Sequence, residues 1–338
     1  MRVLVVTSEW PTESEPQRAR FVVRHVEALR ALGVDIDVYP FRGGGNPLNY
    51  AHIRKDVRSR IRGGSYDLVH AQWGQSALVT LPAPVPLVVT YRGSDLEGVV
   101  GRSGRHTAHG RVLRFVSMFV SRYADAIILV SNSLARHIPG RSFTLAPSGI
   151  DLAHFRPIAR AEARAALQLP VSDHLVLFAA NPAEPIKQYW LAEKTMSRVR
   201  ETFPHVRLIV AHGVQYEQMP LYMNACDVLL LTSAHEGSPN VVKEALACDL
   251  PVVATDVGDV AFRVAGVDGC HVCPQKDAEA LAAGLIDVLR RNARISGRAA
   301  VLDLDERLIA GRVLDVYTQV LQRTGKPPRP LVQASPSR

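Results

Sequence analysis

Two glutamates bracket a Ser-Pro pair in HEGSPNVVKEALACDLPVVATDVGD, residues 235–259. The apolar run VLLL shortly before it is typical of a strand buried on both faces of a parallel sheet. Ser238 is a favourable N-cap. Pro239 is a favourable first helical residue, because its missing N–H would have no partner there. The segment therefore predicts a loop, a helix over residues 239–247 and a second buried strand, PVVATDV.

The same segment carries groups that could bind a ligand. With Ser238 as the cap, the amides of Asn240 and Val241 point out of the helix start, where the helix dipole favours an anion. Glu236 lies just before that point and Glu244 roughly 9 Å further along the helix axis. Carboxylates so placed are poor metal ligands but suit hydroxyls at either end of a diphosphate, as in a nucleotide sugar. The alternative is that both glutamates are ordinary solvated charges.

Apolar runs alternate with helical segments along the chain. The clearest helix, ARFVVRHVEALRALG, ends at Gly33, as expected for a C-terminal glycine. This alternation predicts an α/β fold with two doubly wound, Rossmann-like parallel sheets that face an interdomain cleft, the expected active site. The predicted strands span residues 2–8, 35–41, 67–72, 86–93, 126–131, 143–149, 174–181, 206–213, 227–233 and 251–257.

Length sets the expected domain organisation. A chain of 338 residues exceeds the usual size of one hydrophobic core. We expect an N-terminal domain over residues 1–155 and a second domain over 156–322, joined by the polar, proline-marked segment 148–174. The last helix is a candidate to cross back to the N-terminal domain. Residues 323–338 hold too little apolar content to fold and are expected to be disordered.

Charge is distributed unevenly. Residues 1–150 hold 19 Lys and Arg against 11 Asp and Glu, whereas residues 151–338 hold 21 of each. This asymmetry predicts that the first half faces an anionic phospholipid surface, a lipid-phosphate acceptor or nucleic acid; the absence of a nucleic-acid-binding motif argues against the last. The basic stretch 101–122 mixes Arg with Val, Leu, Phe and Met and is compatible with a bilayer surface. A solvated basic helix face is the alternative for it and for 52–62.

No apolar run reaches the length of a membrane span, and the sequence enters a strand at once without a signal peptide. We therefore expect a cytoplasmic protein, with peripheral contact at the inner face of the cell membrane. The four cysteines lack zinc spacing and the context of a redox CxxC motif. They are predicted to be buried free thiols: Cys226, Cys248, Cys270 and Cys273.

The ordered set of motifs resembles the retaining glycosyltransferases of family 4, also called glycosyl transferases group 1, which have the GT-B fold. EGSPNVVKEALACDLPVVATDVGD resembles their E-x7-E segment with the following strand and glycine. VLVVTSEWPTESEPQRARFVVRHVEALRALGVDIDVYPF resembles their opening strand, acceptor-side loop and first helix. DLVHAQWG, VVTYRGSDL, ILVSNSLARHI, PSGIDLAHFRP and NPAEPIKQYWLAEKTM follow in family order. The similarity covers nearly the whole chain.

The resemblance implies transfer of a hexose-type sugar from a UDP or GDP sugar, with retention of anomeric configuration and without a metal or other cofactor. The acceptor would be a glycan, a lipid-linked molecule or a small molecule, held by the N-terminal domain. Such an activity is typical of polysaccharide biosynthesis. The C-terminal domain would hold the donor.

The resemblance also implies roles for individual residues. Glu244 would bind the ribose hydroxyls, and Glu236 would contact the donor sugar near the reaction centre. Lys187 would bind the diphosphate, and with Glu236 and Arg92 it forms the expected catalytic set. The donor loop would add the amides around Gly237 and Ser238 for sugar hydroxyls and those of Asn240 and Val241 for phosphate, with Pro239 and Asn181 beside them.

The sequence departs from the family pattern near Lys187. Members usually have an arginine a few residues before the lysine, whereas this chain has Asn181, Pro182 and Glu184. One phosphate-binding cation is therefore missing, and Glu184 has the wrong sign if it points inward. Arg92 replaces a common histidine and restores a positive charge to the cleft.

The opening loop departs as well. PQRARF has Ala19 and Arg20 where a glycine is common, which narrows the room for close backbone approach. Arginine and histidine side chains in the first half are candidates to bind the acceptor or the sugar, although a lone histidine is more often structural. These acceptor-side candidates are Arg18, Arg20, His70 and His106, with His109 beside the last.

Three other functions are weighed against this hypothesis. A nicotinamide-dependent oxidoreductase would need G-x-G-x-x-G after an early strand, and VLVVTSEWPTESEP lacks it. A GT-B epimerase or phosphorylase shares the architecture, so only product analysis separates it. A nucleotide-sugar-binding protein without turnover is favoured by the missing arginine and disfavoured by the set Glu236, Lys187 and Glu244.

Overall fold

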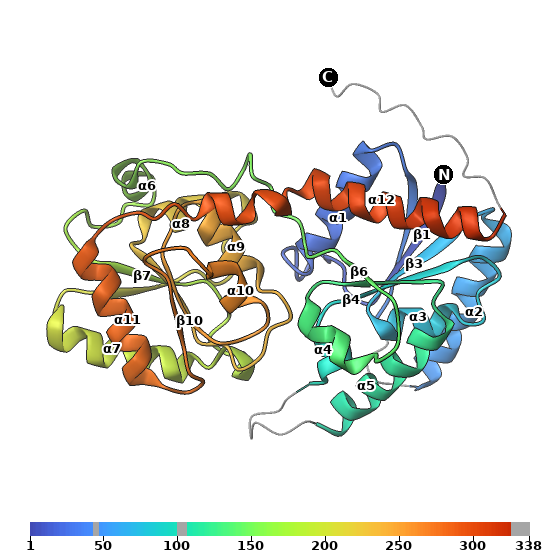
Figure 1. Cartoon of the computed structure of the whole chain (residues 1–338), viewed down its shortest axis with the longest axis horizontal. Helices are drawn as coiled ribbons and strands as arrows, with labels where there is room; N and C mark the ends of the chain where they lie inside the picture. The colour runs from blue at the N-terminus through green and yellow to red at the C-terminus, as the bar shows by residue number, and fades with distance from the viewer. Residues whose placement is uncertain (43–46, 100–106, 326–338) are drawn as a thin grey trace. The chain divides into compact units, whose positions relative to one another are not determined.

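The computed structural model describes residues 1–42, 47–99 and 107–325. The chain divides into two compact units, drawn in Figure 1: unit 1 comprises Met1–Gly149 and the segment from Glu306 onward, and unit 2 comprises Ile150–Asp305. The first boundary thus follows Gly149 rather than residue 155. The last helix, α12 (Glu306–Arg323), belongs to unit 1.

Two sequence-based boundaries need correction. The segment predicted as a connector, residues 148–174, contributes almost entirely to unit 2 and contains helix α6 (Arg160–Ala166). The predicted tail begins at residue 323, which is still the last residue of α12. The remainder of that tail, residues 326–338, lies outside the described residues.

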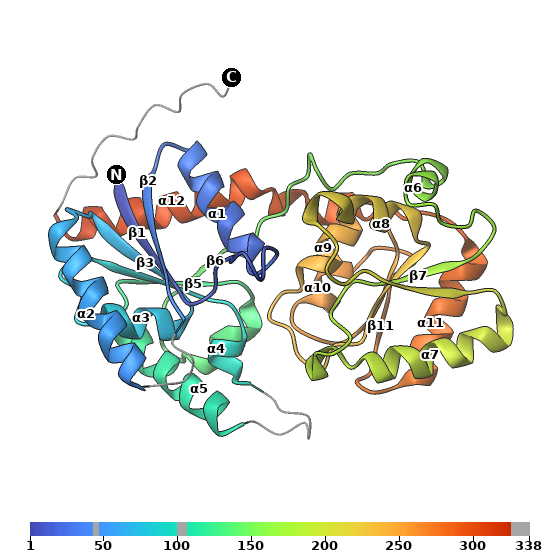
Figure 2. The ribbon, with the colours of Figure 1, turned by 180° about the vertical axis from the view of Figure 1, so that it is seen from behind.

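Unit 1 is built around a six-stranded parallel sheet with the order β2-β1-β3-β4-β5-β6. Helices α1 and α12 cover one face, and α2, α3 and α5 cover the other (Figures 1 and 2). The strands are β1 (Arg2–Thr7), β2 (Asp35–Pro40), β3 (Leu68–Gln72), β4 (Leu87–Tyr91), β5 (Ala126–Leu129) and β6 (Thr144–Leu145). The helices are α1 (Arg20–Ala31), α2 (Pro47–Gly63), α3 (Gly74–Thr80), α4 (Ser94–Glu97), α5 (Ala108–Val120) and α12.

Unit 2 has a five-stranded parallel sheet with the order β11-β10-β9-β7-β8. Helices α7 and α11 cover one face, and α6, α8 and α9 cover the other (Figure 2). The strands are β7 (Leu175–Phe178), β8 (Arg207–Val210), β9 (Val228–Leu231), β10 (Val252–Thr255) and β11 (His271–Cys273). The remaining helices are α7 (Tyr189–Thr202), α8 (Met219–Ala225), α9 (Asn240–Ala247), α10 (Val260–Val264) and α11 (Ala278–Arg291).

Helix α1 illustrates why these residues form these elements. Val22, Val26 and Leu29 are fully buried and recur with helical spacing, so one face of α1 packs on the sheet. Gly33 takes a φ of +86°, and its amide bonds the Arg30 carbonyl at 2.9 Å, which closes the helix as the sequence predicted. Strand β11 was not predicted, because its three residues include a histidine and a cysteine and give only a weak apolar signal.

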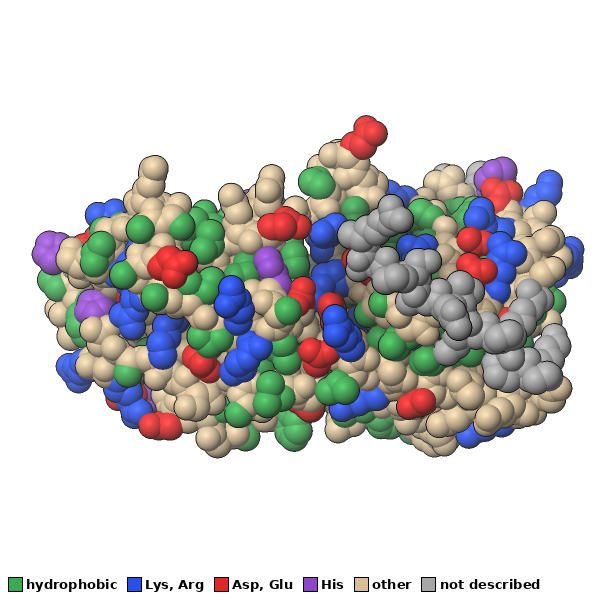
Figure 3. All heavy atoms as spheres, turned by 90° about the horizontal axis from the view of Figure 1, so that it is seen from above, with side chains coloured by type: hydrophobic (Ala, Val, Ile, Leu, Met, Phe, Trp, Pro, Cys, Tyr) green, Lys and Arg blue, Asp and Glu red, His purple; other side chains and the backbone are tan. Residues whose placement is uncertain are grey.

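The face of unit 1 that carries α12 has acidic and basic side chains interspersed (Figure 3). An ion pair between Arg24 of α1 and Glu306 of α12 joins the two helices of this face. Among the described residues, no helix is both long enough and apolar enough to cross a membrane.

Candidate functional site

The carboxyl ends of β7 and β9 define the candidate site in unit 2. In the order β11-β10-β9-β7-β8, strand β7 has β8 on one side and β9 on the other, so the chain reverses direction across the sheet between β7 and β9. Open α/β sheets bind ligands at such a switch point. Lys187 lies in the loop after β7 and Glu236 in the loop after β9. The fold therefore brings together two residues 49 positions apart.

Lys187 and Glu236 form an ion pair. The ammonium of Lys187 donates a hydrogen bond to Glu236 Oε1 at 2.7 Å, and both side chains are only partly exposed, 24% and 17%. The two loops are also tied through the backbone: Thr232 Oγ1 donates to the Lys187 carbonyl at 2.7 Å, and the Ala234 amide donates to the Ile186 carbonyl at 2.8 Å. The pair is thus held on a rigid support, although the sequence did not predict the contact itself.

The start of α9 differs from the prediction. Helix α9 begins at Asn240, and Pro239 is the N-cap with φ −68° and ψ 116°, so Ser238 does not cap the helix. The Ser238 hydroxyl instead donates to Asp259 Oδ2 at 2.8 Å. The prediction failed because a cap needs its side chain beside the first-turn amides, whereas Asp259 draws Ser238 toward the loop after β10.

The first turn of α9 still provides amides for an anion. The amides of Asn240 and Val241 are among the first N–H groups of the helix and have no carbonyl partner within it. Glu244 lies four residues after Asn240, so both side chains project from one face of α9. The Glu244 carboxylate also lies close enough to Cys248 to raise the pKa of its thiol, after burial as the main cause, to about 12.

The loop after β10 packs against the loop after β9, a contact that was not predicted from the sequence. Gly258 has φ +58°, and a Cβ there would lie 2.7 Å from the Gly237 carbonyl oxygen, so this loop touches the loop that carries Glu236 and Gly237, backbone to backbone. Asp259 holds Ser238 and lies 3.5 Å from the Arg263 guanidinium. The sequence could have indicated Asp259. It follows β10, the strand next to β9, and the carboxyl ends of parallel strands lie at the same edge of the sheet.

Residues 181–186, where the family pattern has an arginine, form a tight loop that makes its own hydrogen bonds. Asn181 Oδ1 accepts a hydrogen bond from the Ala183 amide at 3.0 Å, which makes a tight turn after β7. Glu184 is exposed and precedes the short helical turn Pro185–Lys187. Asn181 therefore shapes the loop that delivers Lys187, and Glu184 does not point into a buried site.

Arg92 lies after β4 in unit 1 and is engaged within that unit. Its Nε and Nη2 donate to Gln72 Oε1 at 3.0 and 2.7 Å, and its Nη1 donates to Ser148 Oγ at 3.0 Å. The guanidinium also stacks over the rings of Phe21 and Trp73, 4.9 and 5.5 Å from their centroids. Burial lowers the pKa of Arg92 to about 10. Arg92 is therefore a charged residue held in place by three segments of unit 1.

Trp73 and Asp95 fix the backbone around Arg92, and the sequence analysis missed both. Trp73 has φ +70°, a strained conformation for a bulky residue. Asp95 is fully buried and accepts hydrogen bonds from the amides of Gly93 at 3.0 Å and Gly74 at 3.3 Å. Because burial outweighs these hydrogen bonds, the pKa of Asp95 rises to about 6.

His70 is a buried residue of the unit 1 core. Its Nδ1 lies 2.6 Å from the Tyr317 hydroxyl of α12, and its Nε2 lies 2.7 Å from Thr90 Oγ1. Burial lowers the pKa of His70 well below its ordinary value. The structure thus gives His70 the structural role that was its alternative, not an acceptor contact. His106 lies outside the described residues.

The other acceptor-side candidates lie at the carboxyl end of β1. Arg18 forms ion pairs with Glu9 and, at 2.9 Å, with Glu15. Arg20 is the first residue of α1 and is partly exposed. Ala19 is the N-cap of α1 in the left-handed region, with φ +49°. The position where the family pattern has glycine is therefore one that favours glycine.

The cysteines are free, as predicted, and three are buried; Cys270 is half-buried. Burial raises the pKa of both Cys270 and Cys273 to about 11, so both are thiols near neutral pH. No group of three or more His, Cys, Asp or Glu that could hold a metal ion occurs in the described part of the chain.

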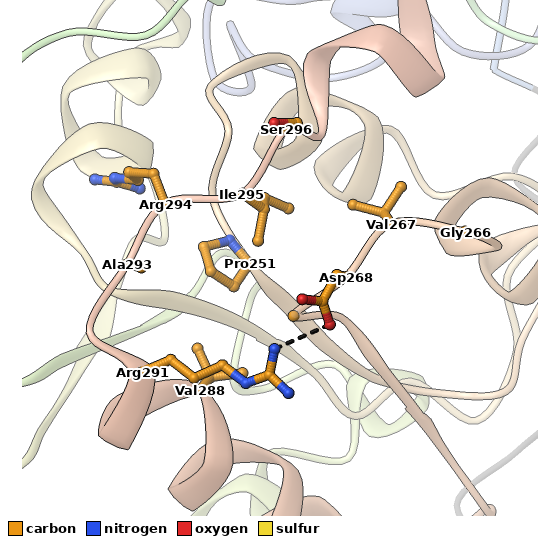
Figure 4. Close-up of a pocket in the computed structure, with 11 residues that line it drawn as sticks. Pro251, Gly266, Val267, Asp268, Val288, Arg291, Ala293, Arg294, Ile295 and Ser296 are labelled. Atoms are coloured by element: carbon orange, nitrogen blue, oxygen red, sulfur yellow. Dashed lines mark hydrogen bonds and ion pairs between the residues drawn. The ribbon is translucent and has the colours of Figure 1, made fainter.

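A hollow in unit 2 lies away from this site (Figure 4). It has a volume of about 380 Å³ and is lined by residues that include Pro251 and Gly269, which precede β10 and β11. An ion pair at 2.9 Å joins Arg291 and Asp268 across it. The hollow is therefore at the amino ends of the strands, at the opposite edge of the sheet from Lys187 and Glu236.

Comparison with known proteins places these features in a family. Residues 1–148 match the model of the glycosyl transferase 4-like domain, and residues 187–291 match the model of the glycosyl transferases group 1. The second match contains the ion pair Lys187–Glu236 and the whole of α9. A Bacillus subtilis (strain 168) protein assigned to teichuronic acid biosynthesis as the glycosyltransferase TuaC is 27% identical over 83% of this chain and 87% of its own length.

Solved structures show the same fold. Sucrose-phosphate synthase from Thermosynechococcus elongatus superposes with a TM-score of 0.78 at 20% identity, over 95% of this chain and 99% of that one. The Anabaena protein Alr3699/HepE, solved in complex with UDP and glucose, has a TM-score of 0.63 at 17% identity, over 96% and 99%. Together with the two family matches, the two Rossmann-like units and the ordered motifs, these comparisons identify the chain as a member of the group 1 glycosyltransferases.

Proposed function

We propose that this protein transfers a hexose-type sugar from a UDP or GDP sugar to an acceptor, with retention of anomeric configuration and without a metal ion. The observation that carries the proposal is the ion pair between Lys187 and Glu236, 2.7 Å long, at the switch point of the unit 2 sheet. A cation, a carboxylate and the start of α9 occupy one loop cluster there. In a nucleotide-sugar donor, the cation and the helix start would bind the phosphates, and the carboxylate would bind the sugar.

In this proposal the diphosphate lies between Lys187 and the amides of Asn240 and Val241. Negative charge grows on the diphosphate as the bond to the sugar breaks. Fixed positive groups aimed at that charge stabilise the transition state more than the bound donor. Lys187 and the helix start perform the role that a divalent cation has in other phosphoryl-bearing sites.

The carboxylates of Glu236 and Glu244 bind the two sugar rings of the donor. Glu236 contacts the donor sugar near its reacting carbon, and Glu244 binds the ribose hydroxyls further along α9. The amides around Gly237 and Ser238 bind sugar hydroxyls, and the contacts from Gly258 and Asp259 hold that loop in shape. When the donor enters, the diphosphate competes with Glu236 for Lys187, which leaves the carboxylate free to face the sugar.

The relatives suggest which donor and acceptor to test first. The Anabaena structure was solved with UDP and glucose, so UDP sugars come before GDP sugars. The Bacillus relative is assigned to teichuronic acid biosynthesis, so a glycan or lipid-linked glycan acceptor comes before a small molecule. We accordingly propose a role in polysaccharide biosynthesis in the cytoplasm.

A nucleotide-sugar-binding protein without turnover is the second candidate, because no arginine occurs among residues 181–186, just before Lys187, and Lys187 is already paired with Glu236. A nucleotide-sugar epimerase of the same fold is the third. Product analysis separates the three. The protein is incubated with radiolabelled UDP-glucose, UDP-N-acetylglucosamine or GDP-mannose in EDTA, with and without glycan, lipid-linked and small-molecule acceptors.

Nuclear magnetic resonance of the product then gives the anomeric configuration. An α-linked product from an α-linked donor, formed in EDTA, supports the proposal. A β-linked product contradicts retention, and activity restored only by Mg²⁺ or Mn²⁺ contradicts metal independence. A donor converted to an epimer without acceptor indicates the epimerase, and binding without any product indicates the binding protein.

A further inference from the structure

Helix α5 exposes an apolar ridge on the side opposite to its packed face. Gly110, Ser117 and Val120 are buried against the rest of unit 1. The opposite side carries five apolar side chains, which we call the α5 patch: Val112, Phe115, Met118, Phe119 and Tyr123, the last just after the helix. Phe115 is 72% exposed, Val112 62% and Tyr123 55%. A run of large apolar groups on one helix face marks an interaction surface rather than scattered exposure.

A groove extends the α5 patch toward α2. Phe119 and Tyr123, whose ring centroids are 5.1 Å apart, form one wall. The other wall comes from Leu81, Pro82 and Val85 between α3 and β4. The groove has a volume of about 350 Å³, and Arg54 of α2 lies at its edge, donating to the Leu81 carbonyl at 2.9 Å. Apolar surface therefore continues beyond the helix itself.

Basic side chains flank this apolar surface. Arg111, Arg114 and Arg122 are exposed beside the ridge, and α5 contains no acidic residue. Helix α2 adds Arg54 at the groove. Asp125 is the acid among the described lining residues of the groove, and its carboxylate accepts a hydrogen bond from the Leu87 amide at 2.7 Å. This differs from the α12 face of unit 1, where charges of both signs are interspersed (Figure 3).

We propose that the α5 patch and its arginines bind the surface of an anionic lipid bilayer. An interfacial helix inserts apolar and aromatic side chains at the level of the headgroups while flanking arginines contact lipid phosphates. The α5 patch supplies the first and Arg111, Arg114 and Arg122 the second. A protein partner would not require this excess of positive charge around the ridge. The inference does not depend on glycosyl transfer, because the contacts involve only unit 1.

The test uses the full chain and vesicles of phosphatidylcholine with about one third phosphatidylglycerol, without donor or acceptor. Wild type is expected to sediment with these vesicles at low salt and to dissociate at high salt, because salt screens exposed charges. Phe115→Ser with Phe119→Ser removes the apolar contact. Arg111→Gln with Arg114→Gln removes two charges. Each double variant is expected to bind at least about tenfold more weakly.

Matched controls come from exposed residues of unit 2. Phe262→Ser removes an aromatic side chain that is 73% exposed, and Arg200→Gln with Arg290→Gln removes two exposed charges. Both controls are expected to bind like wild type, and thermal unfolding verifies that all variants fold. The proposal is overturned if wild type does not bind anionic vesicles, or if the control variants lose as much vesicle binding as the α5 variants. It is also overturned if sedimentation velocity shows a dimer that Phe115→Ser with Phe119→Ser dissociates, which would make the α5 patch a contact between two copies.

Discussion

The ammonium of Lys187 and the carboxylate of Glu236 share a hydrogen bond of 2.7 Å that joins the loops after β7 and β9. In the proposed reaction each has a separate task once the donor is bound. Lys187→Gln and Glu236→Gln should each lower kcat/KM by about 10²–10³, as expected for loss of one preorganised transition-state contact. Steady-state kinetics with the donor that the product analysis identifies measures this. Lys194→Gln, at an exposed position of α7, should leave kcat/KM unchanged. If Lys194→Gln lowered kcat/KM as much as Lys187→Gln, the proposed role of Lys187 would be wrong.

The contact between Gly258 and Gly237 makes a second prediction. Gly258→Ala places a Cβ 2.7 Å from the Gly237 carbonyl oxygen at a positive φ, so the donor loop must move. Gly266→Ala is the control. Gly266 also has a positive φ, +77°, but a Cβ there would meet nothing within 4 Å. Gly266→Ala should lose about 1 kcal/mol of stability from backbone strain, and Gly258→Ala should lose more, because backbone must also move to make room for its Cβ. Only Gly258→Ala should in addition weaken donor binding in calorimetry; equal donor affinity in the two variants would show that the contact does not shape the site.

Ala19 provides a test of local strain. Its φ of +49° is unfavourable for alanine, so Ala19→Gly should raise the free energy of unfolding by about 1 kcal/mol. Ala31→Gly, at the other end of the same helix and exposed, should lower it by about 0.5–1 kcal/mol. Chemical denaturation measures both. Destabilisation by Ala19→Gly would mean that the left-handed conformation is not present in solution.

The pH dependence of stability follows from His25 of α1. Burial, with the nearby charge of Arg92 as a smaller cause, lowers the pKa of His25 to about 3. The folded protein therefore binds fewer protons than the unfolded chain below pH 6.5. Stability that is complete above that pH is lost as the pH falls toward 3, by about 1.4 kcal/mol per pH unit.

His25→Gln should remove this share, so its free energy of unfolding should fall about 2 kcal/mol less than that of wild type between pH 6.5 and 5. His109→Gln, which removes an exposed histidine of α5, is the matched control for the substitution itself. Denaturant titrations between pH 6.5 and 5 measure the free energy of unfolding of each variant. Parallel slopes for His25→Gln and wild type would show that His25 titrates normally in the folded protein. His70 contributes in the same direction, since its pKa is also lowered.

Most of the fold was predictable from the sequence because buried parallel strands leave a direct signal. The runs that became β1, β7, β9 and β10 are short and apolar and lie at the predicted positions. Strand β11 carries a histidine and a cysteine in three residues, so its apolar content is too low for that signal. The boundary at Gly149 was missed for a different reason: chain packing, not composition, decides to which unit a connector belongs.

The candidate site was predictable where one segment supplied it and unpredictable where two segments meet. Glu236 and Lys187 were identified separately from motifs, whereas their contact needs the order of strands in the sheet. The choice of Pro239 over Ser238 as N-cap depends on Asp259, a residue 21 positions away from Ser238. His70 shows the same limit, because its partner Tyr317 is 247 positions distant.

Calorimetric titration of UDP, without metal, into wild type, Lys187→Gln and Glu236→Gln tests the central claim most directly. If Lys187 binds the diphosphate and Glu236 competes for it, Lys187→Gln should weaken UDP by about 1.5–3 kcal/mol, the usual value of a charge-assisted hydrogen bond. Glu236→Gln should bind UDP as tightly as wild type or more tightly, because a negative charge beside the phosphates is gone. Equal weakening in both variants, or UDP and GDP that fail to bind wild type at all, would contradict a donor site at this ion pair.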